Sequence, residues 1–273
     1  MKSISVTDFN LTATLTSGQL FRYKQHEDGF IISHGDKIFF VSKRGNRLFY
    51  DGVKEKFLTY FFRLDEDHKA ILLDINKDIF VNEAINNYRG LRLIRQDPWE
   101  CLVGFVCSSA ANIPKIRMNV NLLCKQFGKP ISYMDNLYFS FPGPGELTDH
   151  EKIRLAKTGF RSRYLHAINN LVDASYLDTL QQMDYKQARA TLMSLPGIGE
   201  KVADCILLFS LGCDKAFPVD TWVHKAMTQL YFPGKHVTPV SIQSFAQDYF
   251  GQCAGYAQQY LFHWMRNRKT NGI

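Results

Sequence analysis

A lysine and an aspartate stand nineteen residues apart in LPGIGEKVADCILLFSLGCDKAFPVD, residues 195–220. Lys201 lies at the start of an otherwise apolar helical run. The N-terminus of a helix disfavours an ammonium ion, and partial burial acts in the same direction, so the neutral amine is favoured. A neutral amine is the form in which lysine attacks carbon. Lys201 is therefore a candidate nucleophile, and the alternative is a lysine that faces solvent.

Two glycines before Lys201 indicate a compact turn between two expected helices. Gly197 and Gly199 can take positive φ angles and expose backbone N–H groups with no Cβ in the way. Those donors would lie beside the N-terminus of the next helix, which attracts anions. The turn therefore predicts contact with one phosphate of a DNA backbone, and a plain helix–helix connection is the alternative.

Asp220 can reach the same end of the helix as Lys201. A helix over 200–211 is about 18 Å long, and residues 212–219 can span about 26 Å when extended. Asp220 also precedes TWVHKAM and can cap that helix, which would hold its carboxylate in place. An amine nucleophile, an oriented carboxylate and a phosphate contact together suit chemistry at the sugar carbon of a nucleotide.

The elements that must position these residues fall into two parts. Residues 29–52, GFIISHGDKIFFVSKRGNRLFYDG, contain short β-rich runs separated by turn residues, which predicts an antiparallel sheet. From about residue 92 the apolar spacing becomes helical. We therefore expect an α+β fold. An N-terminal antiparallel β-sheet domain with short helices (residues 1–91) would pack on a mostly α-helical helix-hairpin-helix body (residues 92–273).

Proline and glycine mark the ends of the first helices in the second part. Helices are expected from Pro98 to about Ser108 and from Pro114 to Phe127, each with proline in its first turn. Gly128 would end the second of them. Six further helical patterns follow along the chain, and the hairpin before Lys201 joins two of these.

The positive charge of the chain is concentrated in the second part. The 273 residues carry a formal net charge of +7. Residues 1–90 hold 13 Lys and Arg against 12 Asp and Glu, whereas residues 91–273 hold 20 against 14. This bias permits a polyanionic partner such as a nucleic acid, although a bias toward solubility is an equally good interpretation.

The cysteines and the hydropathy pattern favour an intracellular protein. Six cysteines are scattered without a CxxC motif or a Cys/His cluster, which predicts reduced core thiols and no metal site. The stretch MKSISVTDFN has no apolar signal segment, and no run of 18 apolar residues predicts a membrane span. We expect a cytoplasmic protein, associated with the nucleoid in a bacterium, and do not exclude a nuclear one.

With these motifs the chain resembles the helix-hairpin-helix base-excision DNA glycosylases, and within them the 8-oxoguanine DNA glycosylase/AP lyases. LPGIGEKVADCI followed by PVD is similar to the active-site signature, with the lysine that marks the bifunctional members. Four further segments are similar to that subfamily, so the resemblance covers nearly the whole chain. They are SGQLFR (17–22), RQDPWECLVGFVCSS (95–109), GFRSRY (159–164) and YAQQYLF (256–262).

The resemblance implies that double-stranded DNA containing 8-oxoguanine is the partner, with the damaged base flipped into a pocket. Lys201 would attack C1′, a Schiff base would form after base loss, and β-elimination would nick the strand. Asp220 would stabilise the positive charge that develops on the sugar and orient the nucleophile. The chemistry needs no cofactor and no metal, and we expect a monomer.

The resemblance also implies a pocket for the damaged base. N7 of 8-oxoguanine carries a proton that guanine lacks, and the backbone carbonyl of Gly18 would accept it. Phe262 would stack on the base, and Gln258, on the same helix face, would bond its Watson–Crick edge. Cys205 would lie under the base. The implied pocket residues are Gly18, Cys205, Pro218, Gln258 and Phe262.

Other residues are implied at the DNA outside the pocket. An aromatic wedge beside an arginine, as in GFRSRY, would fill the gap left by the flipped base. Trp222 takes the place of the family's histidine and His224 follows two residues later, which leaves a phosphate contact by His224 open. The residues expected at the DNA are Asn112, Lys115, Phe160, Arg161, Arg163, Gly197, Gly199 and His224.

The segment CSSAANI (107–113) departs from the family pattern. Ala110 and Ala111 replace two asparagines in a region that helps to hold the cytosine opposite the lesion, whereas Asn112 remains. Lys115 stands where arginine is common, which weakens bidentate recognition of that base. We therefore predict a relaxed preference for cytosine opposite the lesion.

Three other interpretations remain open from the sequence. A monofunctional glycosylase for alkylated bases shares the fold and the aspartate but usually lacks the lysine. A non-catalytic helix-hairpin-helix module would bind DNA through LPGIG and would leave Asp220 without a role. A weaker third interpretation is a preference for single-stranded or mismatched substrate, because the cytosine-contacting region is altered.

Overall fold

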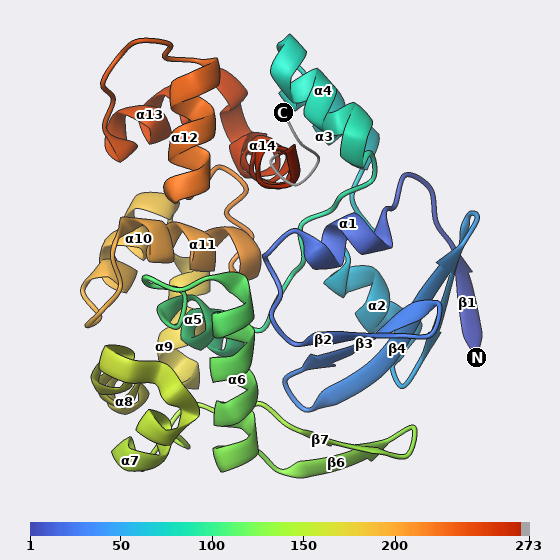
Figure 1. Cartoon of the computed structure of the whole chain (residues 1–273), viewed down its shortest axis with the longest axis vertical. Helices are drawn as coiled ribbons and strands as arrows, with labels where there is room; N and C mark the ends of the chain where they lie inside the picture. Colours follow the sequence, from blue (N-terminus) through green and yellow to red (C-terminus); the bar gives the residue numbers. More distant parts are fainter. Residues whose placement is uncertain (269–273) are drawn as a thin grey trace.

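The computed structural model describes residues 1–268 and confirms the expected α+β fold (Figure 1). An antiparallel sheet and short helices lie on one side of the molecule, and a larger helical body lies on the other. Within the described residues, no helix is long and apolar enough to cross a membrane.

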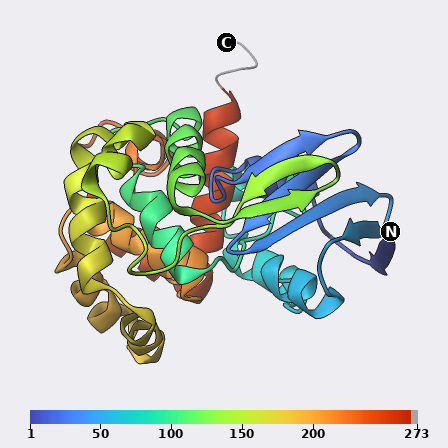
Figure 2. The ribbon, with the colours of Figure 1, turned by 90° about the horizontal axis from the view of Figure 1, so that it is seen from below.

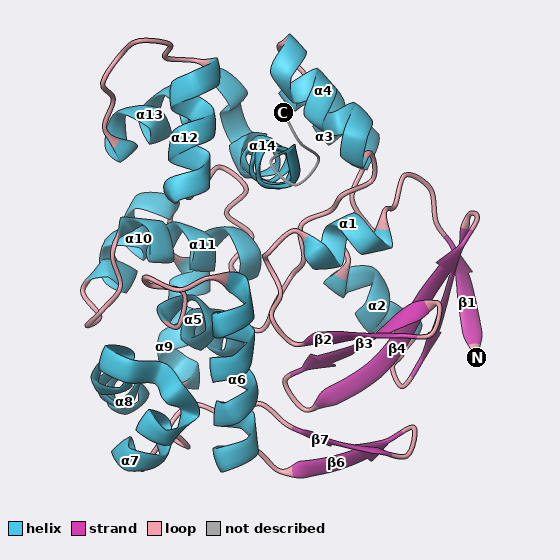
Figure 3. Ribbon diagram, viewed as in Figure 1, coloured by secondary structure: helices cyan, strands magenta, loops and turns pink. Residues whose placement is uncertain are grey.

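The sheet has five antiparallel strands in the order β1-β5-β4-β3-β2 (Figure 3). The HGD and RGN turns connect β3 to β4 and β4 to β5, as the sequence predicts. Gly35 and Gly45 take positive φ angles in these turns, +57° and +55°, which a residue with a Cβ adopts only at a cost. The strands are β1 (Lys2–Ser5), β2 (Tyr23–His26), β3 (Gly29–His34), β4 (Lys37–Arg44) and β5 (Arg47–Asp51).

Four short helices accompany the sheet. Leu15 of the first and Phe61 of the second pack with Phe39 of β4 in an apolar core on one face of the sheet. The last two helices instead lie against the long C-terminal helix of the body (Figure 1). The four are α1 (Leu11–Thr16), α2 (Glu55–Phe61), α3 (His68–Ile75) and α4 (Ile79–Tyr88).

The body consists mainly of helices, and the two predicted from proline placement are confirmed. Pro98 and Pro114 lie in the first turns of α5 and α6, and Gly128 caps the C-terminus of α6. The helices are α5 (Pro98–Val106), α6 (Ile113–Phe127), α7 (His150–Ile153), α8 (Ser162–Leu171), α9 (Ala174–Gln182), α10 (Tyr185–Met193), α11 (Glu200–Ser210), α12 (Thr221–Leu230), α13 (Pro239–Phe250) and α14 (Ala254–Arg268).

A hairpin that the helical pattern did not predict interrupts the body. Strands β6 (Pro130–Tyr133) and β7 (Asn136–Phe139) pair antiparallel and lie beside the N-terminal sheet (Figure 2). Ile131 and Tyr133 pack against a small apolar cluster of the sheet, and the Tyr133 hydroxyl donates to Asp51 Oδ2 at 3.0 Å. The second part is therefore mostly α-helical, as predicted, and this hairpin is an addition that the sequence pattern does not indicate.

The largest apolar core draws on both parts of the chain. Ile75 and Val81, from α3 and α4, belong to the same buried cluster as Tyr256 and Tyr260 of α14. The predicted boundary between residues 1–91 and 92–273 therefore stays a prediction, because buried residues from both sides of it pack in the same core.

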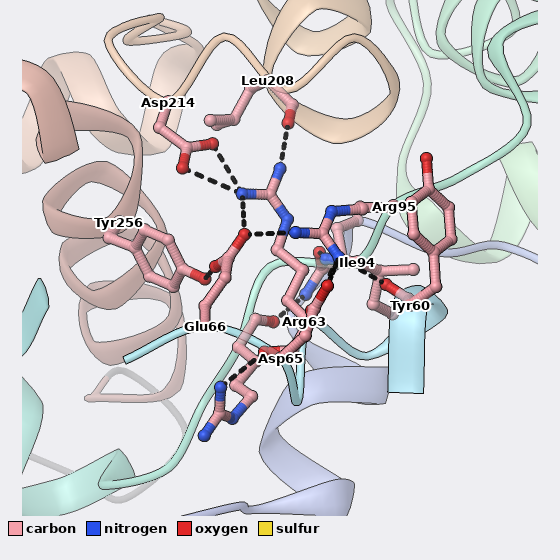
Figure 4. Close-up of polar contacts among 11 residues, drawn as sticks. Tyr60, Arg63, Asp65, Glu66, Ile94, Arg95, Leu208, Asp214 and Tyr256 are labelled. Carbon is pink, nitrogen blue, oxygen red and sulfur yellow. Dashed lines mark hydrogen bonds and ion pairs between the residues drawn. The ribbon is translucent and has the colours of Figure 1, made fainter. Parts of the chain in front are cut away.

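A buried arginine also connects the two parts (Figure 4). Arg63, two residues after the end of α2, is only 1% exposed, and its Nη1 donates to both carboxylate oxygens of Asp214 at 2.7 and 2.9 Å. The same nitrogen lies 3.3 Å from Glu66, whose carboxylate also accepts from Arg95 and from the hydroxyl of Tyr256. This network fixes the loop after α11 and the start of α14 against the N-terminal helices.

Candidate active site

Lys201 lies in the first turn of α11, directly after the glycine hairpin. Its Nζ donates to Ser108 Oγ at 2.9 Å and lies 5.2 Å from the centroid of the Phe105 ring. The Ser108 hydroxyl in turn donates to the Phe105 carbonyl at 2.6 Å, so a lone pair of its oxygen is turned to the amine. These contacts hold the lysine amine at the end of α5.

Asp220 caps the N-terminus of α12, as predicted. Its Oδ1 accepts from the backbone N–H of Val223 at 2.8 Å. Burial raises the pKa of the Asp220 carboxyl above its usual 3.8, whereas the Val223 amide and the charge of Lys201 act to lower it. The loop after α11 thus returns the aspartate to the lysine end of that helix, where the charge of Lys201 acts on it.

A cavity of about 950 Å³ lies where α11, α12, α14 and the turn after α1 meet. Both predicted catalytic residues line it, Lys201 and Asp220, together with all five predicted pocket residues. The five come from segments far apart in the chain, and their roles remain predictions. They are Gly18, Cys205, Pro218, Gln258 and Phe262.

Gly18 occupies a position that only glycine fits. Its φ is +88°, and a Cβ there would lie 2.9 Å from Arg266 Nη1 and 3.2 Å from the Phe262 ring. On the adjacent wall, Gln258 Nε2 donates to the Pro218 carbonyl at 3.1 Å, whereas its buried Oε1 meets no donor among the described residues. That oxygen is therefore available to a ligand.

Cys205 forms a buried part of the cavity wall one turn after the lysine. Burial raises the pKa of its thiol to about 12, although the charge of Lys201 acts against this shift. A thiol with such a pKa stays protonated near neutral pH and is a poor nucleophile. Cys205 can therefore contact a ligand, but the lysine is the candidate that attacks carbon.

The two glycines of the hairpin differ in conformation. Gly197 takes a φ of +80°, and a Cβ there would lie 2.5 Å from the Tyr164 ring. Gly199 does not take a positive φ: it is the N-cap of α11 with a φ of −96°, and a Cβ there would meet no described residue within 4 Å. The surroundings of Gly199 are therefore open, and this residue lines the cavity at the N-terminus of α11.

The segment that departs from the family pattern also borders the cavity. Ala110, Ala111 and Asn112 line it, and Ala110 takes a φ of +50°. Asn112 caps α6 by accepting from the backbone N–H of Lys115 at 3.0 Å. Lys115 itself is half-buried in the first turn of α6 and is not among the lining residues of the described chain.

The expected wedge lies beside that segment. The Phe160 side chain is 52% exposed, and the guanidinium of Arg161 lies 4.7 Å from its ring centroid. Arg161 is buried and donates to the backbone carbonyls of Ser109 and Thr158, whereas Arg163 is exposed. In this state Arg161 fixes the loop beneath an exposed aromatic, and Arg163 is the arginine that faces solvent.

His224 lies apart from the cavity. Its Nε2 is 3.0 Å from the Val237 carbonyl, in the loop between α12 and α13, and Trp222 takes its place in the cavity lining. The geometry gives His224 no position at the reacting groups, so its contact with DNA stays an untested expectation.

The sequence comparisons agree with the motifs. Residues 2–102 match the family model of the 8-oxoguanine DNA glycosylase N-terminal domain. The chain is 29% identical to a probable N-glycosylase/DNA lyase of Methanothermobacter thermautotrophicus over 78% of this chain and 75% of that protein. It is 36% identical to an N-glycosylase/DNA lyase of Arabidopsis thaliana and 32% identical to that of Saccharomyces cerevisiae, over 68% and 81% of this chain. The matches span only 55% and 62% of those two relatives.

Solved structures match over the whole chain. The structure of MBOgg1 with a low-affinity DNA ligand is 35% identical, with a TM-score of 0.93, and the match covers 98% of this chain and 96% of that one. This chain belongs to the 8-oxoguanine DNA glycosylases. The Clostridium acetobutylicum 8-oxoguanine glycosylase/lyase, in complex with DNA containing cytosine opposite 8-oxoguanine, is 29% identical with a TM-score of 0.91, over 100% of this chain and 99% of that one.

Two residues at the glycosylase cavity were missed by sequence reasoning. Ser108 lies within the CSS motif, and its contact with Lys201 needs the fold to become visible. Arg266 lines the cavity and follows Phe262 by four residues and Gln258 by eight, so all three share one face of α14. The helical spacing from Gln258 and Phe262 is the signal that could have identified Arg266.

Proposed function

We propose that this glycosylase removes 8-oxoguanine from duplex DNA and then cuts the strand at the abasic site. Lys201 Nζ attacks C1′ of the flipped nucleotide as the bond from C1′ to the base breaks, and the leaving base takes up the proton that the amine loses. The sugar ring then opens to a Schiff base with the lysine. Loss of a proton from C2′ expels the 3′ phosphate and nicks the strand by β-elimination.

The observation that carries this proposal is the shared cavity of the lysine amine and the buried carboxylate. Asp220 is anchored by the Val223 amide, so its negative charge can stabilise the positive charge that develops at C1′. Ser108 positions the amine by accepting its hydrogen bond. With a volume of about 950 Å³, the cavity has room for a purine base and part of its sugar.

The walls of the cavity support recognition of the oxidised base. The Gly18 carbonyl would accept the N7 proton, Phe262 would stack on the ring, and the free Oε1 of Gln258 would accept from the Watson–Crick edge. Guanine presents a lone pair at N7, which leaves the Gly18 carbonyl without a donor and disfavours the undamaged base.

We infer that the preference for cytosine opposite the lesion is relaxed. Ala110 and Ala111 border the cavity without a polar side-chain group, so neither side chain can hydrogen-bond the estranged base. We also place the activity in the cytoplasm, at the nucleoid in a bacterium, with the protein acting as a monomer.

Product analysis on defined duplexes tests this function. Wild type should release 8-oxoguanine from an 8-oxoguanine:cytosine duplex and nick the strand without added alkali. Lys201→Gln should lose the nick and most base release while it still binds the duplex. Release of 3-methyladenine in preference to 8-oxoguanine, or binding without release of either base, would instead support an alkylated-base glycosylase or a DNA-binding module.

A further inference from the structure

Arg266 holds its guanidinium against the pocket for the flipped base. The Cζ atom lies 5.1 Å from the centroid of the Phe262 ring, and Nη2 donates to the Thr16 carbonyl and lies 3.4 Å from His263 Nδ1. The guanidinium is thus fixed between the aromatic wall of the cavity and the turn that leads from α1 to Gly18.

The second terminal nitrogen of Arg266, Nη1, is buried. Nη1 finds no hydrogen-bond partner in the part of the chain that the structure describes. A Cβ built on Gly18 would lie 2.9 Å from it, which places Nη1 beside the backbone of Gly18. A buried charged donor without a partner costs free energy. A bound ligand with an acceptor atom at this position would satisfy Nη1 and remove that cost.

The oxidised base offers such an acceptor next to the Gly18 contact. In 8-oxoguanine the N7–H donor is bonded to C8, and C8 carries a carbonyl oxygen. A protein acceptor and a protein donor that lie side by side can therefore form two hydrogen bonds with this edge, one from N7–H and one to the C8 oxygen, as two amides do when they pair. Because Nη1 of Arg266 lies beside the Gly18 backbone, the Gly18 carbonyl and Nη1 would form such a pair toward the base. Guanine has a C8–H bond at this position, so it has no C8 oxygen to accept from the arginine.

We propose that Arg266 is a specificity-determining residue that donates from Nη1 to the C8 oxygen of flipped 8-oxoguanine. The proposal rests on the function proposed above and adds a second contact that distinguishes the lesion from guanine. A hydrogen bond from a charged donor in a buried site contributes more than one between neutral groups, so its loss lowers affinity measurably.

An electrostatic role is the main alternative for Arg266. Its charge acts on Asp220 and lowers the pKa of that carboxyl. Such a role would affect every substrate that reacts at C1′, including an abasic site without a base. The contact with the C8 oxygen affects only substrates that carry this oxygen, so the two roles give different substrate patterns.

Arg266→Met separates these roles, because methionine keeps an apolar stem over Phe262 and removes the donors. Arg268→Met is the matched control: Arg268 lies on the same helix, 4.9 Å from the Trp264 ring, and is exposed. Binding would be measured with a duplex that carries 2′-fluoro-8-oxoguanine, which resists cleavage, and with a tetrahydrofuran abasic analogue. For the same variants, the rate of single-turnover excision of 8-oxoguanine and the rate of nicking at a preformed abasic site would also be measured.

We expect Arg266→Met to weaken binding of the 8-oxoguanine duplex and to slow its excision by at least about tenfold. Binding of the tetrahydrofuran duplex and nicking of the abasic site should change less than about twofold, as should every quantity for the control. Equal losses on both kinds of substrate, or no loss on 8-oxoguanine, would overturn the proposal. Absence of 8-oxoguanine excision by wild type would instead overturn the proposed function.

A duplex with 2′-fluoro-8-oxoadenine tests whether Arg266 donates to the C8 oxygen or to O6 of the base. This base keeps N7–H and the C8 oxygen but has an amino group in place of O6 and lacks the N1 proton and the 2-amino group, so the effect of Arg266→Met is compared as a ratio to wild type on the same duplex. Arg266→Met should weaken binding of this duplex by the same factor as for 8-oxoguanine, and no further loss would overturn the assignment to C8. If Arg266→Met does not fold, Arg266→Gln replaces it, and its shorter donor should give a smaller loss with the same substrate pattern.

Discussion

At the scale of single residues, the site depends on a buried carboxylate whose ionised form is favoured by its neighbours and disfavoured by its burial. Asp220 is held by the Val223 amide and feels Lys201 and Arg266, which both lower its pKa, yet burial raises it more. The ionised form is therefore costly in the free protein and becomes favourable when positive charge develops at the sugar. Function and stability make opposite demands on this side chain.

Asp220→Asn should separate those demands. Asparagine is an equally good N-cap, so α12 stays capped, and a buried charge is removed. Activity should fall by about 10²–10³-fold or more. Because burial raises the folded-state pKa above 3.8, the ionised aspartate destabilises wild type fully above that raised value and not at all below 3.8.

Denaturant unfolding at several pH values checks the stability half of this expectation. At neutral pH the variant should be at least as stable as wild type, and this advantage should vanish as the pH falls through the range in which Asp220 is protonated. The acid limb of wild-type activity should lie above pH 3.8. A variant that is active, or less stable than wild type only at neutral pH, would contradict this account.

The opposite-base preference is also decided by single side chains. Wild-type rates of 8-oxoguanine excision should differ by about tenfold or less among the four bases opposite the lesion. The double variant Ala110→Asn, Lys115→Arg should prefer cytosine at that position by about tenfold or more beyond the wild-type preference. Ala110 has a φ of +50°, a conformation that asparagine adopts more readily than alanine, so the change should not destabilise the loop. A wild-type cytosine preference of several hundred-fold would refute the inference.

At the scale of elements, the hairpin before α11 positions both the phosphate contact and the lysine. Gly197→Ala should lower the free energy of unfolding by about 2–4 kcal/mol, from the left-handed backbone and the overlap with Tyr164. Gly199→Ala is the matched control for stability, because its backbone is extended and its surroundings are open, so about 1 kcal/mol or less should be lost. Equal losses would show that the packing of Tyr164 does not fix the hairpin.

The same hairpin shows what local sequence can predict. Glycine spacing and the N-capping aspartate predicted the turn, the start of α11 and the return of Asp220, because these depend on nearby residues. The backbone of Gly199 was not predictable, since an open position accepts glycine with either sign of φ. The β6–β7 hairpin was missed because Met134 and Asp135 take its positive φ angles, +46° and +54°, without the Asn-Gly or Asp-Gly signal of such turns.

At the scale of the whole molecule, the site depends on two parts of the chain that are held together by buried charge. Arg63 and Asp214 are 151 residues apart, and no local pattern could have paired them. Arg266 and Gly18 meet for the same reason, since packing of α14 against the N-terminal segments brings them into contact. Motifs therefore predict the groups at the site, whereas long-range packing decides which of them meet.

Arg63→Met should destabilise the fold by about 3–5 kcal/mol, because Asp214 and Glu66 would be left partly buried without their partner. Arg44→Met is the control: Arg44 is 70% exposed in its pair with Asp28 and should cost less than about 1 kcal/mol. Chemical denaturation of both variants measures the difference. If the two variants unfold at the same denaturant concentration as wild type, the network does not join the two parts.

The central claim is that Lys201 becomes covalently bound to the sugar of the damaged nucleotide. Borohydride trapping on an 8-oxoguanine:cytosine duplex, followed by peptide mapping, tests it most directly. We predict a covalent protein–DNA adduct for wild type, located at Lys201, and no adduct for Lys201→Gln. Base release without an adduct, or an adduct at another residue, would contradict the account.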